Sequence, residues 1–317
     1  MLFRTEFNPK TQHALIDAGD KLFLIGSCFA ENISKKLINL NWDILSNPHG
    51  NLFNPASVQR CVSDISELRE YDSSDLHFSE ELYHSFSHHG SFSGRNEEDT
   101  LHQINTKLQF ANAYLKNSKW CIITLGSAWV YRHIATDTIV ANCHKIPQKE
   151  FTKELLSVSE ITHFLEATVN LLKSIHPEIK IIFTISPVRY LKDGFIENSR
   201  SKAHLITSIH EIIENESDLF YFPAYELFMD DLRDYRFTNE DMIHPNEMAI
   251  EYIWQKFIAC FFGENAINFN ADMQQLANMK NHRPLNMDTK SFSDFTAKIR
   301  QFETQMFQKY PFLNFEK

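Results

Sequence analysis

The chain lacks long apolar runs and paired cysteines. No stretch of 18 consecutive apolar residues occurs, so the sequence offers no candidate membrane-spanning helix. The five cysteines are scattered without a Cys-x-x-Cys pair, which is typical of reduced thiols rather than of a disulfide framework or a zinc site. The first residues lack a basic segment followed by an apolar run and a cleavage site. We therefore expect a cytoplasmic protein with no membrane association.

Basic residues, glycine and proline are also scarce. Lys and Arg number 31 against 41 Asp and Glu, a formal net charge of -10. Nucleic-acid binding depends largely on neutralising backbone phosphates, so we expect no nucleic-acid partner. Only 8 Gly and 10 Pro occur in 317 residues, too few for a disordered or fibrous chain. The 27 Phe and the hydrophobic fraction of 43% instead indicate a globular chain with a large core.

Short apolar runs that end in turn residues alternate with longer segments of helical periodicity. This alternation is typical of βαβ units around a parallel sheet. The predicted strands are Leu22–Ile25, Cys121–Leu125, Ile181–Ile185 and Leu219–Phe222, with a weaker one at Trp42–Leu45. In such sheets, ligands bind outside the carboxyl ends of the strands. Each strand end is therefore a candidate wall of a site.

Apolar stripes at helical spacing predict the covering helices and the domain limits. The stripes run from Val158 to Ile175, from Leu205 to Ile213 and, behind a cap at Asn246, from Met248 to Phe261. They predict an α/β domain over residues 1–262. A polar, Ser- and His-rich segment at about 54–115 is expected to form an insertion with its own helices.

The remaining residues, 263–317, are expected to form a C-terminal extension. A loop is predicted over Asn265–Asn286, followed by an amphipathic helix with an apolar stripe from Phe292 to Met306. Such a stripe packs either on its own domain or against a second subunit. A homodimer is therefore one of two open alternatives.

Histidines gather in the insertion at His84, His88 and His89. No cysteine or carboxylate accompanies them at the spacing of a metal site. We therefore expect solvated loop residues here and no metal.

Ser27 follows a predicted strand in the segment Gly26-Ser27-Cys28-Phe29-Ala30. A hydroxyl at this strand-to-helix turn points into the expected site, although a serine here also serves as an ordinary helix cap. Cys28 is the rival nucleophile, because a thiolate attacks more readily than a hydroxyl. Consecutive residues leave a turn in different directions, so we expect Cys28 to be a small buried side chain.

Asp241 and His244 lie just before the last helix of the predicted domain. Three positions apart, they can face each other within one turn, with Asp241 fixing the tautomer of His244 for general-base catalysis. Alone, the pair is better explained as an acidic helix start beside a surface histidine. Together with Ser27 it predicts one site with a catalytic triad.

The chain resembles the GSCFA family, which is grouped with the SGNH (GDSL-like) hydrolases. The resemblance rests on Gly26–Ala30, on Asp241-x-x-His244, and on the segments Asn142–Lys145, Ser186–Arg189 and Asp234–Phe237, so it covers roughly residues 1–262. It implies a three-layer α/β/α, flavodoxin-like fold. It also implies acyl-ester chemistry by a serine nucleophile, without a cofactor or a metal.

The resemblance assigns roles to individual positions. It implies Ser27 as nucleophile with Asp241 and His244, and the N–H groups of Ser27, Gly50 and Gly126 as oxyanion donors. The superfamily also places an Asn amide in the oxyanion hole, but Ala128 stands at that position here. Candidate substitutes are Asn51, Ser127, Asn142 and His144. Arg189 could hold a substrate carboxylate or phosphate, or pair with a neighbouring acid.

These observations predict a serine hydrolase of SGNH type. It is expected to act on an acetyl or short-chain O-acyl ester of a small molecule or carbohydrate. Two alternatives stay open at this point: an O-acyltransferase with the same triad, and a binding protein that kept the fold and lost catalysis together with the oxyanion Asn.

Overall fold

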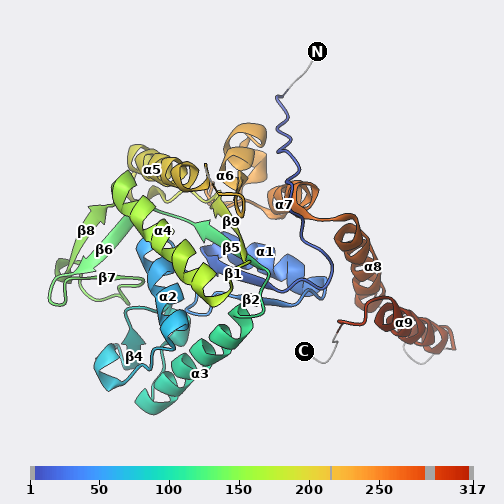
Figure 1. The fold of residues 1–317 in the computed structure, drawn as a ribbon, viewed down its shortest axis with the longest axis horizontal. Helices are drawn as coiled ribbons and strands as arrows, with labels where there is room; N and C mark the ends of the chain where they lie inside the picture. The colour runs from blue at the N-terminus through green and yellow to red at the C-terminus, as the bar shows by residue number, and fades with distance from the viewer. Residues whose placement is uncertain (1–3, 215, 283–289, 314–317) are drawn as a thin grey trace.

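Five parallel strands form the central sheet of the protein (Figure 1). The structure is a computed structural model that describes residues 4–214, 216–282 and 290–313. The strands are β1 (Leu22–Gly26), β2 (Ile44–Ser46), β5 (Trp120–Leu125), β9 (Lys180–Ile185) and β10 (Leu219–Phe222), in the spatial order β10-β9-β5-β1-β2. This is the flavodoxin-like order. It confirms the predicted sheet, including the weaker strand that follows Trp42.

Both faces of the sheet are buried, which explains why its strands read as continuous apolar runs. In β1, Phe23 and Ile25 point into one hydrophobic cluster, whereas Leu22 and Leu24 point into the other. The two clusters lie on opposite faces because successive side chains of a strand alternate.

Helices cover each face and complete a three-layer α/β/α arrangement (Figure 1). One face carries α2 (Pro55–Glu67), α3 (Glu97–Leu115), α4 (Val158–Ile175) and α5 (Phe195–Ile213). The other carries α1 (Cys28–Asn39), α6 (Ala224–Glu226), a π-helical turn at Leu227–Asp231 and α7 (Glu247–Phe261). The architecture is the one that the family resemblance implied.

Two helices of the predicted insertion belong to these layers. Val58 of α2 and Leu108 of α3 are buried in the same cluster as Phe23 of β1. Their polar outer faces give residues 54–115 a hydrophilic average although each helix has a buried side. The division of the chain at residue 262 stays a prediction.

Two small antiparallel sheets lie outside the central one, and neither was expected from the sequence. A hairpin joins β3 (Leu76–Ser79) to β4 (Leu82–Ser85), and a second sheet has the order β7-β6-β8. Its strands are β6 (Trp129–His133), β7 (Thr138–Val140) and β8 (Phe151–Leu155). Each of these strands has only three to five residues, too few for an alternating pattern to identify a strand in sequence.

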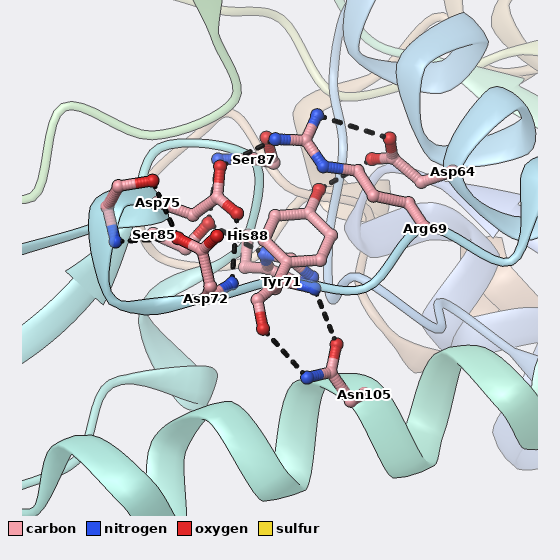
Figure 2. Close-up of polar contacts among 10 residues, drawn as sticks. Asp64, Arg69, Tyr71, Asp72, Asp75, Ser85, Ser87, His88 and Asn105 are labelled. Carbon is pink, nitrogen blue, oxygen red and sulfur yellow. Dashed lines mark hydrogen bonds and ion pairs between the residues drawn. The ribbon is translucent and has the colours of Figure 1, made fainter.

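A polar network fastens the hairpin segment to α2 and α3 (Figure 2). The backbone of Tyr71 exchanges two hydrogen bonds of 2.9 Å with the side chain of Asn105 on α3. The hydroxyl of Tyr71 donates to Asp64 of α2 at 2.6 Å, and Arg69 pairs with both Asp64 and Asp75. The segment that leads into the hairpin is therefore anchored to both helices.

The C-terminal extension contains a helix where a loop was predicted. α8 (Glu264–Asn281) buries Ala266, Phe269, Met273 and Leu276, which recur at helical spacing. The loop predicted over 265–286 is therefore wrong for residues 265–281, and residues 283–286 lie outside the described residues. Several asparagines in α8 hide this stripe in the sequence.

The predicted final helix is confirmed as α9 (Lys290–Lys309), and α8 and α9 project from the sheet domain (Figure 1). Met306 of α9 joins the cluster that contains Phe269 of α8, so the stripe packs against its own chain. A homodimer through this helix stays a prediction. Among the helices of the described residues, none combines the length and apolarity that crossing a bilayer requires.

Acid should destabilise the protein through the buried His49. Its ring is 1% exposed and lies 4.1 Å from the ring of His88, and burial lowers the pKa of His49 to about 3. Below pH 6.5 the unfolded chain binds a proton that the folded chain excludes. Stability should therefore fall by up to about 1.4 kcal/mol per pH unit as the pH drops from 6.5 towards 3.

Urea unfolding at pH 7 and pH 5 measures this contribution. The loss of stability between the two pH values should be smaller in His49→Phe than in wild type. A His102→Gln control, at an exposed position on α3, should behave like wild type. Equal losses in wild type and His49→Phe would contradict the assignment.

Candidate functional site

The turn after β1 places Ser27 at the carboxyl edge of the sheet. Gly26 has a φ of +137°, and a Cβ there would lie 2.1 Å from the carbonyl oxygen of Thr124, so only glycine fits. Ser27 is the N-cap of α1, and its Oγ accepts a long hydrogen bond of 3.4 Å from the N–H of Phe29. Ser27 thus caps α1 and also lies at the carboxyl end of β1, where a nucleophile was expected.

Asp241 and His244 form a hydrogen-bonded pair in the turn before α7. Nδ1 of His244 lies 2.6 Å from one carboxylate oxygen, and the other oxygen accepts the N–H groups of Ile243 and His244 at 2.9 Å. The backbone N–H of His244, then that of Ile243, and then the imidazole lower the pKa of Asp241 to about 2. An ionised Asp241 holds the proton on Nδ1, which leaves Nε2 as the accepting nitrogen.

Ser27 and His244 line the same cleft, which has a volume of about 900 Å³. Within the described residues no hydrogen bond joins Ser27 to His244. The structure thus brings Ser27 and His244 to one cleft, and Asp241 is hydrogen bonded to His244. The hydroxyl and the imidazole are not hydrogen bonded to each other in this conformation. Cys28 also lines the cleft, and burial raises the pKa of its thiol, which disfavours the reactive thiolate.

The predicted oxyanion N–H groups already have acceptors. Ser27 donates to the Thr124 carbonyl at 3.0 Å, Gly50 to Asn47 at 2.8 Å and Gly126 to Phe53 at 2.8 Å. The first bond continues the pairing of β1 with β5, the second closes a turn, and the third joins the end of β5 to the segment before α2. The conformation in the structure therefore does not present the three-donor oxyanion hole that the resemblance implied.

Gly50 is also displaced from the cleft. Its φ is +77°, and a Cβ on it would lie 2.3 Å from the Cβ of His89, so His89 covers it. The cleft is lined instead by Phe53 and Asn54, a few residues further along the same segment.

Ala128, at the position of the superfamily Asn, is fully buried in the core. Its N–H donates to Oγ of Ser201 on α5 at 2.7 Å. The position contributes no side-chain donor, and its backbone N–H and carbonyl are bonded to Ser201 and Leu156.

The four candidate substitutes lie in different surroundings. Asn51 bonds to Asn47 and Glu31 and does not line the cleft. His144 is buried and hydrogen bonds to the Ser85 carbonyl at 2.8 Å.

Ser127 and Asn142 do line the cleft. Oγ of Ser127 accepts from the N–H of Trp129 at 3.0 Å, and Oδ1 of Asn142 accepts from the N–H of His144 at 2.9 Å. The amide nitrogen of Asn142 donates to no described residue, so of the four it is the one with an uncommitted side-chain N–H in the cleft.

Arg189 contacts the Asp241–His244 turn rather than a carboxylate. Its Nη2 donates at 2.7 Å to the carbonyl of Met242, a residue with a φ of +58° inside that turn. The guanidinium also lies 5.8 Å from the ring of Phe195. Arg189 lines the cleft and thus ties the end of β9 to the segment that carries His244.

Lys202 is a buried cation at the site that the sequence gave no reason to expect. It is 1% exposed, and Nζ donates at 2.8 Å to the carbonyls of both Gly126 and Ser186, which follow β5 and β9. The Tyr225 ring lies 5.3 Å away, and Lys202 makes no ion pair with any described residue. Lysine is almost always a surface residue, so its burial follows from tertiary packing alone.

Aromatic side chains form one wall of the cleft. Trp129 and Tyr131 of β6, together with Tyr190, line it, and Nζ of Lys153 lies 4.9, 5.5 and 5.9 Å from their ring centroids. Lys153 also pairs with Asp193. The small sheet thus supplies two of the three rings that line the same cleft as Ser27. In the described part of the chain, no group of three or more potential ligands is placed to hold a metal ion.

Comparison with known proteins identifies a family match. The model of the GSCFA family matches residues 21–257, a range that includes Ser27, Asp241 and His244. No curated protein matches the chain in sequence.

Solved structures of similar fold include a carbohydrate esterase family 3 protein from Talaromyces cellulolyticus. Its sequence identity is 9% and its TM-score is 0.36, and the match covers 82% of this chain and 98% of the esterase chain. A family 3 carbohydrate esterase from Clostridium thermocellum has 8% identity and a TM-score of 0.36, covering 81% and 98%. An acetyl xylan esterase from the rumen bacterium Butyrivibrio proteoclasticus has 12% identity and a TM-score of 0.39, covering 77% and 63%.

Burial of Lys202 should make stability rise with pH. Burial lowers the pKa of Lys202 to about 7 from its ordinary 10.5. Between these values the unfolded chain keeps a proton that the folded chain loses, so stability rises by up to about 1.4 kcal/mol per pH unit. Relative to Lys202→Met, wild type should therefore gain stability between pH 7 and pH 9. Parallel urea-unfolding profiles of the two proteins would refute this.

Proposed function

The chain belongs to the GSCFA family, and we propose that it is a serine esterase of SGNH type. The proposed substrate is an acetyl or short-chain O-acyl ester of a small molecule or a carbohydrate. The observation that carries the proposal is the 2.6 Å Asp241–His244 pair, because His244 lines the same cleft as the buried Ser27. No metal or organic cofactor takes part in this chemistry.

The proposed mechanism follows from the arrangement of these three side chains. Oγ of Ser27 attacks the acyl carbonyl carbon while its proton passes to Nε2 of His244. His244 returns the proton to the alcohol oxygen as the ester bond breaks. Water, deprotonated by the same imidazole, then attacks the acyl carbon, and His244 returns this proton to Oγ of Ser27 as the acyl–Oγ bond breaks. Asp241 stays ionised throughout and orients His244.

Closure of the Ser27–His244 contact is the conformational step that this mechanism requires. The 3.4 Å bond from Phe29 to Ser27 is long, so the hydroxyl loses little on leaving it. His244 is about half exposed, and its ring has room to approach. Catalytic hydrogen bonds are often long before substrate binds.

The cleft lining supports a carbohydrate as the alcohol. Trp129, Tyr131 and Tyr190 present ring surfaces on which the C–H faces of a sugar can pack. If the acceptor is a sugar hydroxyl rather than water, the same triad performs O-acyl transfer.

A binding protein without catalysis is the second candidate. The engaged N–H groups of Ser27, Gly50 and Gly126, together with Ala128, favour it, because an oxyanion without donors is poorly stabilised.

Labelling with a fluorophosphonate probe separates the two candidates. We expect the wild type to be labelled and to hydrolyse 4-nitrophenyl acetate, and Ser27→Ala to lose both, because the probe phosphonylates an activated serine. The same loss of turnover, by about 10²-fold or more, is expected for His244→Ala.

Ser34→Ala and Cys28→Ser serve as controls, since Ser34 is a buried serine of the same helix that bonds to the Ala30 carbonyl. Both should keep labelling and turnover. A folded wild type that is neither labelled nor active on aryl esters would support the binding protein, and labelling lost in Cys28→Ser alone would identify the thiol as nucleophile.

A further inference from the structure

Asn54 presents an uncommitted amide in the cleft. The residue is 5% exposed and lines the cleft together with Ser27 and Gly126. It is the N-cap of α2, and its Oδ1 accepts from the N–H of Ser57 at 2.8 Å. Its Nδ2 donates to no described residue.

The cap bond fixes the orientation of this amide. A backbone N–H can only donate, so the atom that faces Ser57 is Oδ1, and the NH₂ group is on the opposite side. Asn54 is therefore held through Oδ1, which leaves both N–H bonds of Nδ2 available in the cleft.

Backbone hydrogen bonds place Asn54 beside the nucleophile. The N–H of Leu52 donates to the Gly26 carbonyl at 2.9 Å, and the Phe53 carbonyl accepts from Gly126 and Ser127 at 2.8 and 2.9 Å. Residues 52 and 53 are thus bonded to the ends of β1 and β5, the strands that Ser27 and Gly126 follow. Asn54 is the next residue, and Pro55 after it begins α2.

Two helices begin at this part of the cleft. Ser27 is the N-cap of α1, and Asn54 is the N-cap of α2. The N-terminal end of each carries partial positive charge, which favours an anion formed between them. Two helix starts and an uncommitted amide therefore converge where the Ser27 adduct would form.

We propose that Asn54 is a catalytic residue that donates from Nδ2 to the oxyanion and replaces the donor that Ala128 lacks. This inference rests on the proposed esterase function. As the bond between Ser27 and the acyl carbon forms, the carbonyl π electrons move to oxygen, and the Nδ2–H bond of Asn54 stabilises that charge. The charge returns to the carbonyl when the alcohol leaves.

Asn54→Asp and Asn54→Ser test the role of the amide without removing the cap. Both residues are good N-caps, so α2 should keep its Ser57 bond and the melting temperature should stay within about 3 °C of wild type. Both lack the NH₂ group. We expect kcat for 4-nitrophenyl acetate to fall about 10²- to 10³-fold, with KM changed less than about threefold.

Asn96 offers a matched control. It is an exposed N-cap on α3 whose Oδ1 accepts from the N–H of Asp99 at 3.0 Å. Asn96→Asp and Asn96→Ser should keep wild-type kcat, which separates loss of a donor from exchange of a cap. Asn142→Asp tests the rival amide of the cleft, and its loss of kcat should be smaller than that of Asn54→Asp.

The outcomes distinguish this inference from the proposed function. If wild type is active and Ser27→Ala is not, full kcat in folded Asn54→Asp and Asn54→Ser would overturn the role of Asn54. Loss of turnover in Asn142→Asp with no loss at Asn54 would assign the donor to Asn142 instead. If wild type shows neither turnover nor labelling, the esterase itself is refuted and the role of Asn54 is refuted with it.

Discussion

The close approach of Gly26 to Thr124 is the constraint on which the site depends. With no side chain at Gly26, the end of β1 lies against β5, and the N–H of Ser27 continues the ladder by donating to Thr124. Any larger residue would push the strands apart at the point where α1 begins. The segment at Leu52 and Phe53 is bonded to these same strand ends, so the positions of Ser27, Asn54 and Gly126 all follow from one tight crossing.

Local patterns made much of the fold readable. β1, β5 and β9 are buried on both faces, and the Asp241–His244 contact spans only three positions, so both are visible in sequence. The failures depend on tertiary contacts. The sequence of α8 is polar on average, and its apolar stripe is recognisable only once it packs in the hydrophobic core. Nothing in the residues near Lys202 in sequence indicates that its side chain is buried. Asn54 before Pro55 is a recognisable helix start, but only the fold shows that this start faces Ser27.

The surroundings of Gly126 and Ala128 differ from those that the family resemblance implied. The Phe53 carbonyl accepts from two consecutive N–H groups, of Gly126 and Ser127, so both of these donors are already engaged. Ala128, two residues after Gly126, belongs to the hydrophobic core. Asn54, the residue after Phe53, lines the cleft together with Gly126.

Folding of this protein is coupled to the release of a proton from Lys202. Because the ammonium is enclosed between the Gly126 and Ser186 carbonyls and the Tyr225 ring, folding under mildly alkaline conditions expels a proton from this side chain into the solvent. The heat of folding will therefore include the ionisation enthalpy of whichever buffer takes up that proton. Calorimetric enthalpies of this protein are consequently comparable only between buffers of similar ionisation enthalpy.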